Sequence, residues 1–487
     1  MDSDSRDRLN HNLQRFAEIL TSDEIERIIT LQDEPLPTGI RINRLKADPQ
    51  KAIRDLSEHY GWQVDPLSFI ENGWAISSAE VSPGKTIEHR MGQYYLQDAA
   101  SMVPATLFKK NKPDPLILDL AASPGGKTTH LIDRTLDKGF ILANDASIAR
   151  IPALRSVLSS WGGINIAITN YPGESFGAWY PETFDLVLLD APCSMENLRP
   201  TPSHPMRETT SDERLRLQQR QVQLLTSGLQ ALKIGGQLVY ATCSLAPEED
   251  EAVVNAVLNR SPTAVDLTDI SSFFTGASPG LSGFKGHAYH PDLKNTLRLW
   301  PHRSGTSGFF CALLTKKDSI PLTPQNPPRR DFTRTGLVRL DASTQQTLID
   351  LFDEIYGFKL DEVIQIYDLE LYNREGQLFL IPQRYLDGFR SLPFEHIGMP
   401  LGRWVHQTFE PAHELISRFG QMFSQGIIQI ENEFVEHWIA GRDIRNLHTD
   451  IPPNGQYLLV KSPAGQNLGL GKLLPKRLRN MLPRQSV

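Results

Sequence analysis

The sequence predicts an α/β fold whose core is a Rossmann-like, doubly wound parallel sheet. Between about residues 116 and 317, apolar runs of strand length alternate with amphipathic helical segments, which indicates a parallel sheet with helices on both faces. The first run, 116–120, leads into a turn of small residues and then a helix, the arrangement of a nucleotide-binding corner. A chain of 487 residues is long enough for two to four domains, so this core accounts for only part of it.

The segments before this core predict a smaller unit over residues 1–85. Apolar side chains at helical spacing indicate helices over 1–35, and the alternating run 40–43 is typical of a strand. We therefore expect a helical and small α/β subdomain. Arg41 and Asn43 lie on the expected strand, where they either contact substrate or, more simply, are polar residues on the surface of an edge strand.

The core itself is expected over residues 86–317. Its clearest helix is 214–232, in which apolar side chains recur at helical spacing before Gly235 and Gly236 end the helix. The strands expected in the core are 116–120, 140–144, 165–169, 184–190, 236–241, 263–267, 297–300 and 308–315.

A proline-rich stretch at 318–335 is typical of a linker, and a second globular region follows it. This region divides into a small α/β connector over 336–395 and a last domain over 396–487. Within the connector we expect a helix at 343–356 and short strands at 363–367, 370–372 and 378–381. The tail from 472 to 484 has five basic residues and no acid, which predicts either a local basic patch or a solvated end.

The composition narrows the class of protein. A net charge of −7 and a pI of about 6.0 argue against nonspecific coating of nucleic acid, without excluding a local basic groove. Three cysteines in so long a chain fit a reducing compartment, and the absence of a CxxC pair argues against a metal site. The sequence has no apolar run of transmembrane length and a polar, acidic start. We expect a cytoplasmic monomer with no membrane partner.

Three ligands compete for the nucleotide-binding corner. A phosphate-binding P-loop would need glycine at position 121, which is alanine, and a dinucleotide fingerprint is absent. S-adenosylmethionine fits better, because Asp145 ends the next expected strand at the distance from which a carboxylate accepts ribose hydroxyls. An ordinary α/β turn without a ligand is the remaining alternative. The loop residues that would line this cofactor are Ala121, Ala122, Ser123, Pro124, Gly125, Gly126 and Lys127.

Two of the three cysteines follow buried strands at the edge where ligands bind in this architecture. Cys193 follows the strand that ends at Asp190, and Cys243 follows the strand at 236–241, whereas Cys311 lies in an apolar run typical of a core. A thiolate that adds to C6 of a pyrimidine makes C5 able to attack a methyl donor. Asp190, if protonated, can hydrogen-bond the cytosine edge. Both cysteines could instead be small core residues, but two on separate loops favour chemistry.

These segments resemble the Sun/Nop-type RNA (cytosine-5) methyltransferases, especially bacterial members that act on 16S ribosomal RNA. The resemblance implies a class I S-adenosylmethionine methyltransferase core and a C-terminal PUA-like RNA-binding region. The core motifs are AASPGGKT, NDAS at 144–147, LDAPCS at 189–194, YATCSLAPEEDE at 240–251 and RLWPHRSGTSGFFCALL at 298–314. The C-terminal motifs are FEPAH at 409–413 and NLGLGKLLPKRLRNMLP at 467–483.

The resemblance also implies a role for each site residue. Cys243 would attack C6, Cys193 would assist product release, and Asp190 would bind the target base near the donor. The loop 121–127 would line the methionine and ribose of the cofactor, and Asp145 would hold the ribose. The implied partner is RNA, as ribosomal RNA or the small ribosomal subunit, bound in part by the N-terminal unit.

The sequence departs from the family pattern at two places. Residues 170–173 lack the acid that contacts adenine near position 172, and Met195–Pro200 replace a small, glycine-containing stretch after Cys193. Three alternatives remain for the function. They are a tRNA cytosine-5 methyltransferase, a DNA cytosine-5 methyltransferase that would use Cys193 and leave the second cysteine unexplained, and a non-catalytic ribosome-assembly factor.

Overall fold

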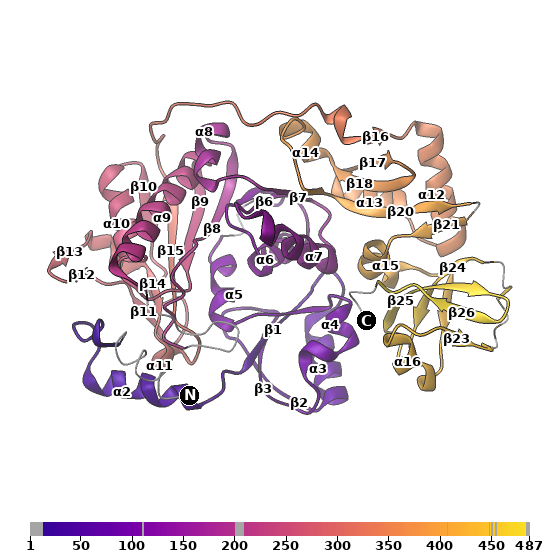
Figure 1. Cartoon of the computed structure of the whole chain (residues 1–487), viewed down its shortest axis with the longest axis horizontal. Helices are drawn as coiled ribbons and strands as arrows, with labels where there is room; N and C mark the ends of the chain where they lie inside the picture. Colours follow the sequence, from indigo (N-terminus) through magenta and orange to yellow (C-terminus); the bar gives the residue numbers. More distant parts are fainter. Residues whose placement is uncertain are drawn as a thin grey trace.

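The computed structural model describes residues 13–109, 112–199, 209–406, 408–447, 449, 451–452 and 455–483. Four sheets of four or more strands organise these residues. Figure 1 shows the N-terminal sheet below the large central sheet, with the two C-terminal sheets to the right. In the part of the chain that is described, none of the helices has the length and apolar character needed to cross a bilayer.

The N-terminal unit packs a helix against a four-stranded sheet of order β2-β3-β1-β4. The helix α3 begins where the Asp48 side chain accepts a hydrogen bond from Lys51 N at 2.8 Å, and it ends at Gly61, whose φ is 64°. The elements are α2 (Ser22–Thr30), β1 (Thr38–Ile42), α3 (Pro49–Tyr60), β2 (Trp62–Pro66), β3 (Gly73–Ala79), α4 (Ile87–Arg90), β4 (Tyr94–Leu96) and α5 (Ala99–Thr106).

Arg41 and Asn43 are fully buried, so their expected surface position is wrong. Strand β1 lies between β3 and β4 rather than at an edge, and both side chains contact residues of the central unit. The Arg41 guanidinium lies 4.5 Å from the ring centre of Trp161 and donates to Thr129 Oγ1 at 2.6 Å. Asn43 Nδ2 donates to the Trp161 carbonyl at 2.8 Å. Neither residue is available to substrate.

The central sheet has ten strands in the order β11-β14-β15-β9-β8-β5-β6-β7-β19, with β10 paired to β15. The five strands β7, β6, β5, β8 and β9 are mutually parallel, as predicted. The prediction of a parallel sheet is wrong for the expected strands 263–267, 297–300 and 308–315, because β10, β14 and β15, together with β11, extend the sheet in antiparallel fashion. The strands are β5 (Leu116–Asp119), β6 (Phe140–Asn144), β7 (Ile166–Thr169), β8 (Phe184–Asp190), β9 (Leu232–Thr242), β10 (Val265–Thr268), β11 (Ala277–Pro279), β14 (Leu297–Leu299), β15 (Phe309–Lys316) and β19 (His396–Ile397). A small hairpin of β12 (Gly283–Phe284) and β13 (His287–Ala288) lies apart.

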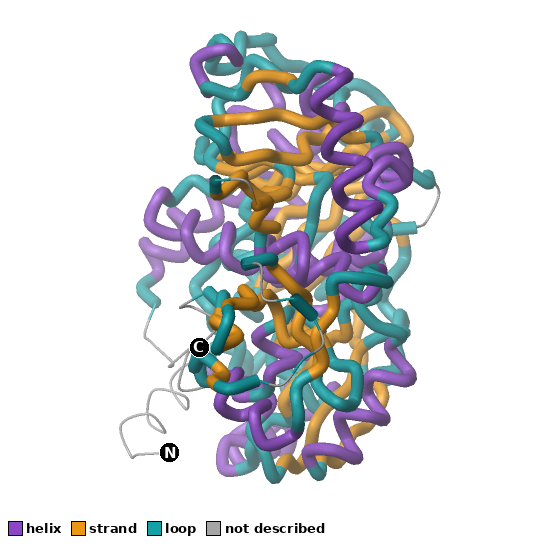
Figure 2. The backbone as a smooth tube through the Cα atoms, turned by 90° about the vertical axis from the view of Figure 1, so that its right-hand side faces the viewer, coloured by secondary structure: helices purple, strands orange, loops and turns teal. Residues whose placement is uncertain are grey.

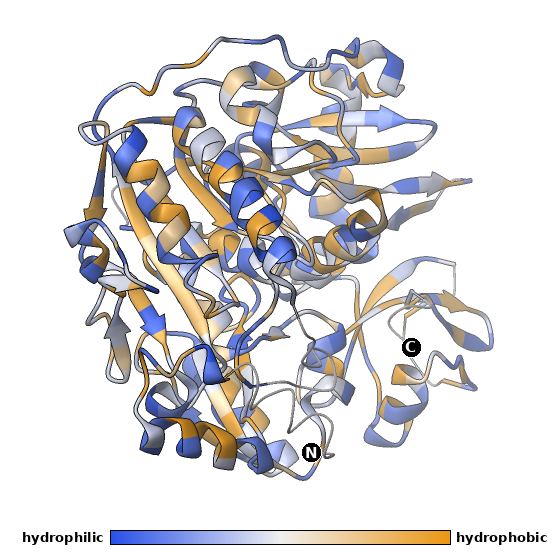
Figure 3. Ribbon diagram, turned by 60° about the vertical axis from the view of Figure 1, so that its left-hand side comes forward, coloured by the Kyte–Doolittle hydropathy of each residue, from blue (hydrophilic) through white to orange (hydrophobic). Residues whose placement is uncertain are grey.

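Helices cover both faces of this sheet because its parallel strands are apolar on both sides. Leu118 points into one hydrophobic cluster, with Val222 and Leu229 of α9, while Ile117 points into another, with Leu131 of α6 and Leu154 of α7. Figure 3 shows the apolar strands between helices whose outer surfaces are polar. The helices are α6 (Gly126–Thr135), α7 (Ile151–Trp161), α8 (Phe176–Trp179), α9 (Ser211–Ala231), α10 (Glu251–Arg260) and α11 (Pro301–Ser304).

The C-terminal half forms two five-stranded sheets, which Figure 2 views from their own side with helices flanking them. The first sheet runs from 338 to 411 and so crosses residue 396, where the sequence predicts a domain boundary. Its elements are β16 (Val338–Arg339), α12 (Ala342–Tyr356), α13 (Leu360–Tyr367), β17 (Leu369–Arg374), β18 (Gln377–Pro382), α14 (Gln383–Gly388), β20 (Met399–Val405) and β21 (Thr408–Pro411). The second contains α15 (His413–Phe419), β22 (Ile427–Gln429), α16 (Asn432–Ile439), β23 (Ile444–Arg445), β24 (Tyr457–Lys461), β25 (Asn467–Leu474) and β26 (Arg477–Asn480).

Residues 363–367, predicted as a strand, belong instead to the helix α13. Its β-branched and aromatic residues favour a strand locally, but Leu360 and Val363 lie three residues apart and are both buried. Ile366 points outward and is 56% exposed. The helical spacing of the buried positions therefore overrides the local preference.

Candidate active site

The loop between β5 and α6 requires glycine at two successive positions for different reasons. Gly125 precedes α6 with a φ of 112°, which only glycine adopts freely. A Cβ atom on Gly126 would lie 2.9 Å from Cε1 of Tyr95, closer than real Cβ contacts. The backbone thus turns sharply and presents the first amide groups of α6 at the carboxyl end of β5, where they suit a polar ligand.

Asp145 follows β6 and lies against this loop. It is 3% exposed, and its Oδ2 accepts a hydrogen bond from Ser123 N at 3.2 Å. Its Oδ1 accepts from Ser147 N at 2.9 Å, and Arg150 Nη1 lies 3.5 Å from Oδ2. The structure therefore brings the predicted ribose acid to the predicted cofactor loop.

Asp119 is a second acid at this corner that the sequence reasoning missed. It ends β5, is fully buried and accepts a hydrogen bond on Oδ2 from Thr128 Oγ1 at 2.7 Å. Its Oδ1 is buried without a hydrogen-bond partner among the described residues, and burial raises the pKa of this carboxyl to about 7. An unsatisfied carboxylate oxygen beside Asp145 and the amides of α6 suits a cofactor with cationic and hydroxyl groups.

The two cysteine loops meet at the same edge of the sheet. Because β8 and β9 are parallel neighbours with Asp190 opposite Ala241, the loops that follow them start side by side. The sulfur atoms of Cys193 and Cys243 lie 3.2 Å apart, and both thiols are free. Cys311 is fully buried on β15, within the core.

Lys127 connects the cofactor loop to both cysteine loops. Its Nζ donates to Asp190 Oδ2 at 2.7 Å and to Ser101 Oγ at 3.0 Å, and it lies 5.3 Å from the ring centre of Phe309. Burial acts to lower the pKa of Lys127, but Asp190 and Cys243 raise it, and the net change is an increase. The ammonium group therefore remains charged beside Asp190 and Cys243.

Glu249, fully buried behind the sulfur pair, joins the two loops from inside. Its carboxylate accepts hydrogen bonds from Ser194 N at 2.9 Å, from the Ser194 hydroxyl, from Ser244 Oγ at 3.0 Å and from Gln221 Nε2 at 3.0 Å. Its signal in the sequence is its position in the acidic run that follows Cys243. The residue fixes the spacing of the two thiols.

The two thiols have different electrostatic surroundings. The hydrogen bond with Cys243 raises the pKa of Cys193, as do burial and the nearby Glu249 carboxylate. Cys243, in contrast, lies close enough to Lys127 to stabilise its ammonium. Burial, the contact with Cys243 and the Glu249 carboxylate therefore favour the neutral thiol of Cys193.

Comparison with known proteins places this geometry in a family. The model of the 16S rRNA methyltransferase RsmB/F family matches residues 105–315, and that of the N-terminal domain of 16S rRNA methyltransferase RsmF matches residues 10–99. The ribosomal RNA small subunit methyltransferase F of Shewanella piezotolerans is 30% identical over 470 residues, which cover 95% of this chain and 94% of that protein. The chain belongs to the RsmB/F family of 16S rRNA methyltransferases.

Other relatives agree with this family. The corresponding protein of Erwinia tasmaniensis is 31% identical over 470 residues, covering 96% of this chain and 94% of its own length. The crystal structure of a methyltransferase homologue from Pyrococcus horikoshii superposes with a TM-score of 0.56 at 31% identity, over 65% of this chain and all of that one. RsmB/F membership confirms the expected cytosine methyltransferase class, with S-adenosylmethionine as the methyl donor.

The segment Met195–Pro200, which departs from the RsmB/F pattern, is described as far as Arg199. A residue of the N-terminal segment holds it in place. The buried Glu196 carboxylate pairs with Arg15 at 2.6 Å and with Arg214 at 3.0 Å. Arg15 also pairs with Glu248, in the loop after Cys243, at 2.9 Å. Nothing in the sequence identified Arg15, which is 181 residues from Glu196.

The other RsmB/F departure leaves the expected adenine end of the site without an acid. Asn170 Nδ2 donates to the Asp145 carbonyl at 2.7 Å, and Tyr171 N donates to Asn144 Oδ1 at 3.0 Å. The next acid, Glu174, pairs with Arg220 at 3.0 Å. The Asn170 amide therefore lies beside Asp145, and Glu174 is paired with Arg220.

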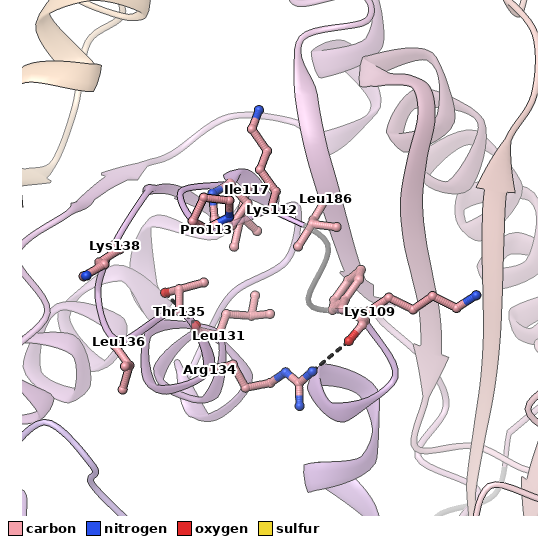
Figure 4. A pocket seen from close by; sticks show the side chains of 12 residues that line it. Lys109, Lys112, Pro113, Ile117, Leu131, Arg134, Thr135, Leu136, Lys138 and Leu186 are labelled. Carbon is pink, nitrogen blue, oxygen red and sulfur yellow. Dashed lines mark hydrogen bonds between the residues drawn. The ribbon is translucent and has the colours of Figure 1, made fainter.

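A cavity of about 410 Å³ lies at the opposite end of the RsmB/F core sheet, around the start of β5. Its apolar lining includes Ile117 and Leu131, and Figure 4 shows the amines of Lys112 and Lys138 pointing away from it. The cavity therefore plays no part in the site at the carboxyl ends of the strands. The described residues contain no cluster of three potential metal ligands.

Proposed function

We propose that this chain methylates C5 of a cytosine in 16S ribosomal RNA through a covalent bond between Cys243 and C6 of the base. The observation that carries the proposal is the pair of sulfur atoms, 3.2 Å apart, beside the contact between Lys127 and Asp190. Two thiols and a charged lysine at the end of a methyl-donor sheet fit the activation of a pyrimidine carbon better than any other transfer.

Cys243 acts as the nucleophile, with its sulfur close to the Lys127 ammonium and 3.2 Å from the Cys193 sulfur. The sulfur electron pair forms the bond to C6, and the electrons of the C5–C6 double bond make C5 nucleophilic. S-adenosylmethionine supplies the methyl group that C5 attacks. A base then takes the C5 proton, and the electrons of the C5–H bond restore the C5–C6 double bond and expel the Cys243 thiolate. Cys193, which keeps its proton, hydrogen-bonds the departing sulfur and so assists release.

Asp190 and the loop residues complete the site. Asp190, held by Lys127, receives the edge of the cytosine ring close to the methyl donor. Residues 121–127 hold the methionine and ribose side of the cofactor, and Asp145 accepts the ribose hydroxyls. Asp119, with an unsatisfied oxygen, attracts the cationic part of the same molecule.

The flanking units dock the RNA. We propose domains at 1–85 and 86–317, a linker at 318–335, and two further domains that meet after residue 411 instead of at the expected 395/396, because the sheet from β16 to β21 continues past that point. We propose a PUA-like fold for the last domain. Lys476, Arg477 and Arg479 are exposed on the C-terminal sheet, although Arg477 pairs with Asp443 at 3.3 Å. Of the two other basic residues of the tail, Lys472 donates to the Tyr457 hydroxyl at 3.3 Å and Arg484 lies outside the described residues. We propose that the protein works in the reducing cytoplasm, which agrees with its free thiols. We also propose that it is a monomer.

The nucleophile is the point that separates this function from the alternatives. RNA that contains 5-fluorocytidine, presented as 16S RNA in small ribosomal subunits from cells lacking this gene, should trap the protein on Cys243 by mass spectrometry. An adduct on Cys193 would indicate chemistry of the DNA methyltransferase type, and methylation of tRNA alone would indicate a different substrate. Cys243→Ala should abolish transfer while calorimetry still shows S-adenosylmethionine binding, and residual turnover would refute the assignment.

A further inference from the structure

Met195 differs from every other residue of the segment that follows Cys193. Among residues 194–199, all of which are described, Met195 alone is exposed, at 40%, while its neighbours Ser194 and Glu196 are 2% and 4% exposed. An apolar side chain thus faces solvent two residues from a thiol of the sulfur pair.

The backbone that carries this side chain is fixed on both sides. Ser194 is bound by the Glu249 carboxylate, and Glu196 is held by Arg15 and Arg214. The Met195 carbonyl accepts a hydrogen bond from Asn197 N at 2.8 Å. The Met195 side chain therefore starts from a point that is fixed relative to the thiols.

Met195 also has a backbone conformation that disfavours a side chain. Its φ is 62°, in the left-handed region that glycine adopts freely and other residues rarely do. Glycine at this position would remove the backbone strain and the exposed apolar surface together. Met195 combines a strained backbone with an exposed apolar side chain close to the two thiols. This combination indicates that its side chain has a functional role.

We propose that Met195 forms one wall of the pocket for the target cytosine and packs its thioether against the aromatic ring of the flipped base. This inference rests on the proposed function. An extruded base needs contacts on its faces to replace the stacking that it loses, and a polarisable, flexible thioether provides such a contact. Met195 is thus a substrate-contacting residue peculiar to this chain's loop, whereas Arg15 and Glu249 act by positioning.

The test uses a variant that should keep or raise the stability of the protein while it weakens the contact with the base. Met195→Gly removes the side chain and the strain, so its Tm should equal or exceed that of the wild type, while KM for small ribosomal subunits rises roughly five- to tenfold. Met195→Leu keeps an apolar wall and should stay within about twofold in KM. Met422→Ala removes another exposed methionine, 55% exposed and far along the chain, and should leave KM unchanged.

The binding of S-adenosylmethionine, measured by calorimetry, should be equal in all four proteins. An unchanged KM and kcat for Met195→Gly would overturn the proposal, as would a loss of cofactor affinity equal to the loss of activity. If the wild-type protein itself leaves the subunits unmethylated, the failure belongs to the proposed function and not to Met195.

Discussion

Arg15 and Glu196 form an ion pair of 2.6 Å that joins the N-terminal segment to the loop after Cys193. The same guanidinium reaches Glu248 at 2.9 Å, after the second cysteine. One side chain from outside the core therefore bridges the two loops whose sulfur atoms must meet. It does so on the solvent side, while Glu249 joins the loops from the interior.

Arg15→Ala should slow catalysis more than it weakens folding. Glu196 keeps Arg214 as a partner, so we expect a loss of about 1–3 kcal/mol in the free energy of unfolding, but the two loops lose their shared contact. The expected result is a kcat reduced at least tenfold with S-adenosylmethionine affinity unchanged. Arg15→Lys, which retains the charge but not the forked geometry, should recover part of kcat. Equal kcat in all three proteins would contradict the bridging role.

The proton on Cys193 should depend on its partner. The Cys243 hydrogen bond is the largest of the effects that raise the pKa of Cys193, so Cys243→Ala should lower that pKa. Alkylation of Cys193 by iodoacetamide should then reach half its maximal rate at a lower pH than in the wild type. Peptide mass spectrometry measures the extent of alkylation at each pH. Glu249→Gln removes a further effect that raises this pKa and should shift the profile in the same direction. A shift to higher pH in either variant would disprove the arrangement.

Asp119 should make folding stability depend on pH. Burial raises its pKa to about 7, whereas an unfolded aspartate titrates near 3.9, so the folded protein holds the proton more tightly. This contribution is present in full below about pH 4 and is lost as the pH rises through 7. Relative to Asp119→Asn, the wild type should lose roughly 2–3 kcal/mol between pH 5 and 8, measured by urea unfolding. Parallel pH profiles of the two proteins would rule this out.

Gly125→Ala should weaken the binding of S-adenosylmethionine by about tenfold or more. The φ of 112° strains any side chain, and the new Cβ would lie 3.0 Å from Val157 Cγ1, so the loop must shift. Gly235→Ala is the matched control, because Gly235 has a φ of 83° and nothing within 4 Å of the added atom. That variant should lose stability but bind the cofactor as the wild type does. Calorimetry on both proteins gives the comparison.

The parallel half of the core could be predicted from the sequence because its strands are short, buried and separated by strong helices. Leu116–Asp119 and Phe184–Asp190 appear where their apolar runs indicate them. The helix at 360–367 could not be predicted, because its short apolar run has strand-forming residues and only tertiary packing shows the helical spacing. The burial of Arg41 depends on a contact with Trp161, which is distant in sequence.

Some residues of the site could likewise be predicted from the sequence, and others could not. Cys193, Cys243 and Lys127 belong to local motifs, and parallel strands bring the ends of such motifs to one edge, so their proximity follows from topology. Arg15 acts through contacts across loops, which no local pattern encodes, whereas Glu249 lies in the motif at 240–251 although its contacts with Ser194 and Gln221 could not be predicted. The sequence gives no sign of the position of Asp119, because this residue lies inside the expected strand 116–120, between two leucines.

The two-residue strand β19, from the C-terminal half, forms the last member of the central sheet, where His396 pairs with Ile168. Cutting the chain at the linker would remove this strand and uncover the backbone amides and carbonyls of β7. An apolar strand with a bare edge is a template for intermolecular pairing. The methyltransferase core without its C-terminal half should therefore aggregate, so the core needs the C-terminal half on the same chain to stay in solution.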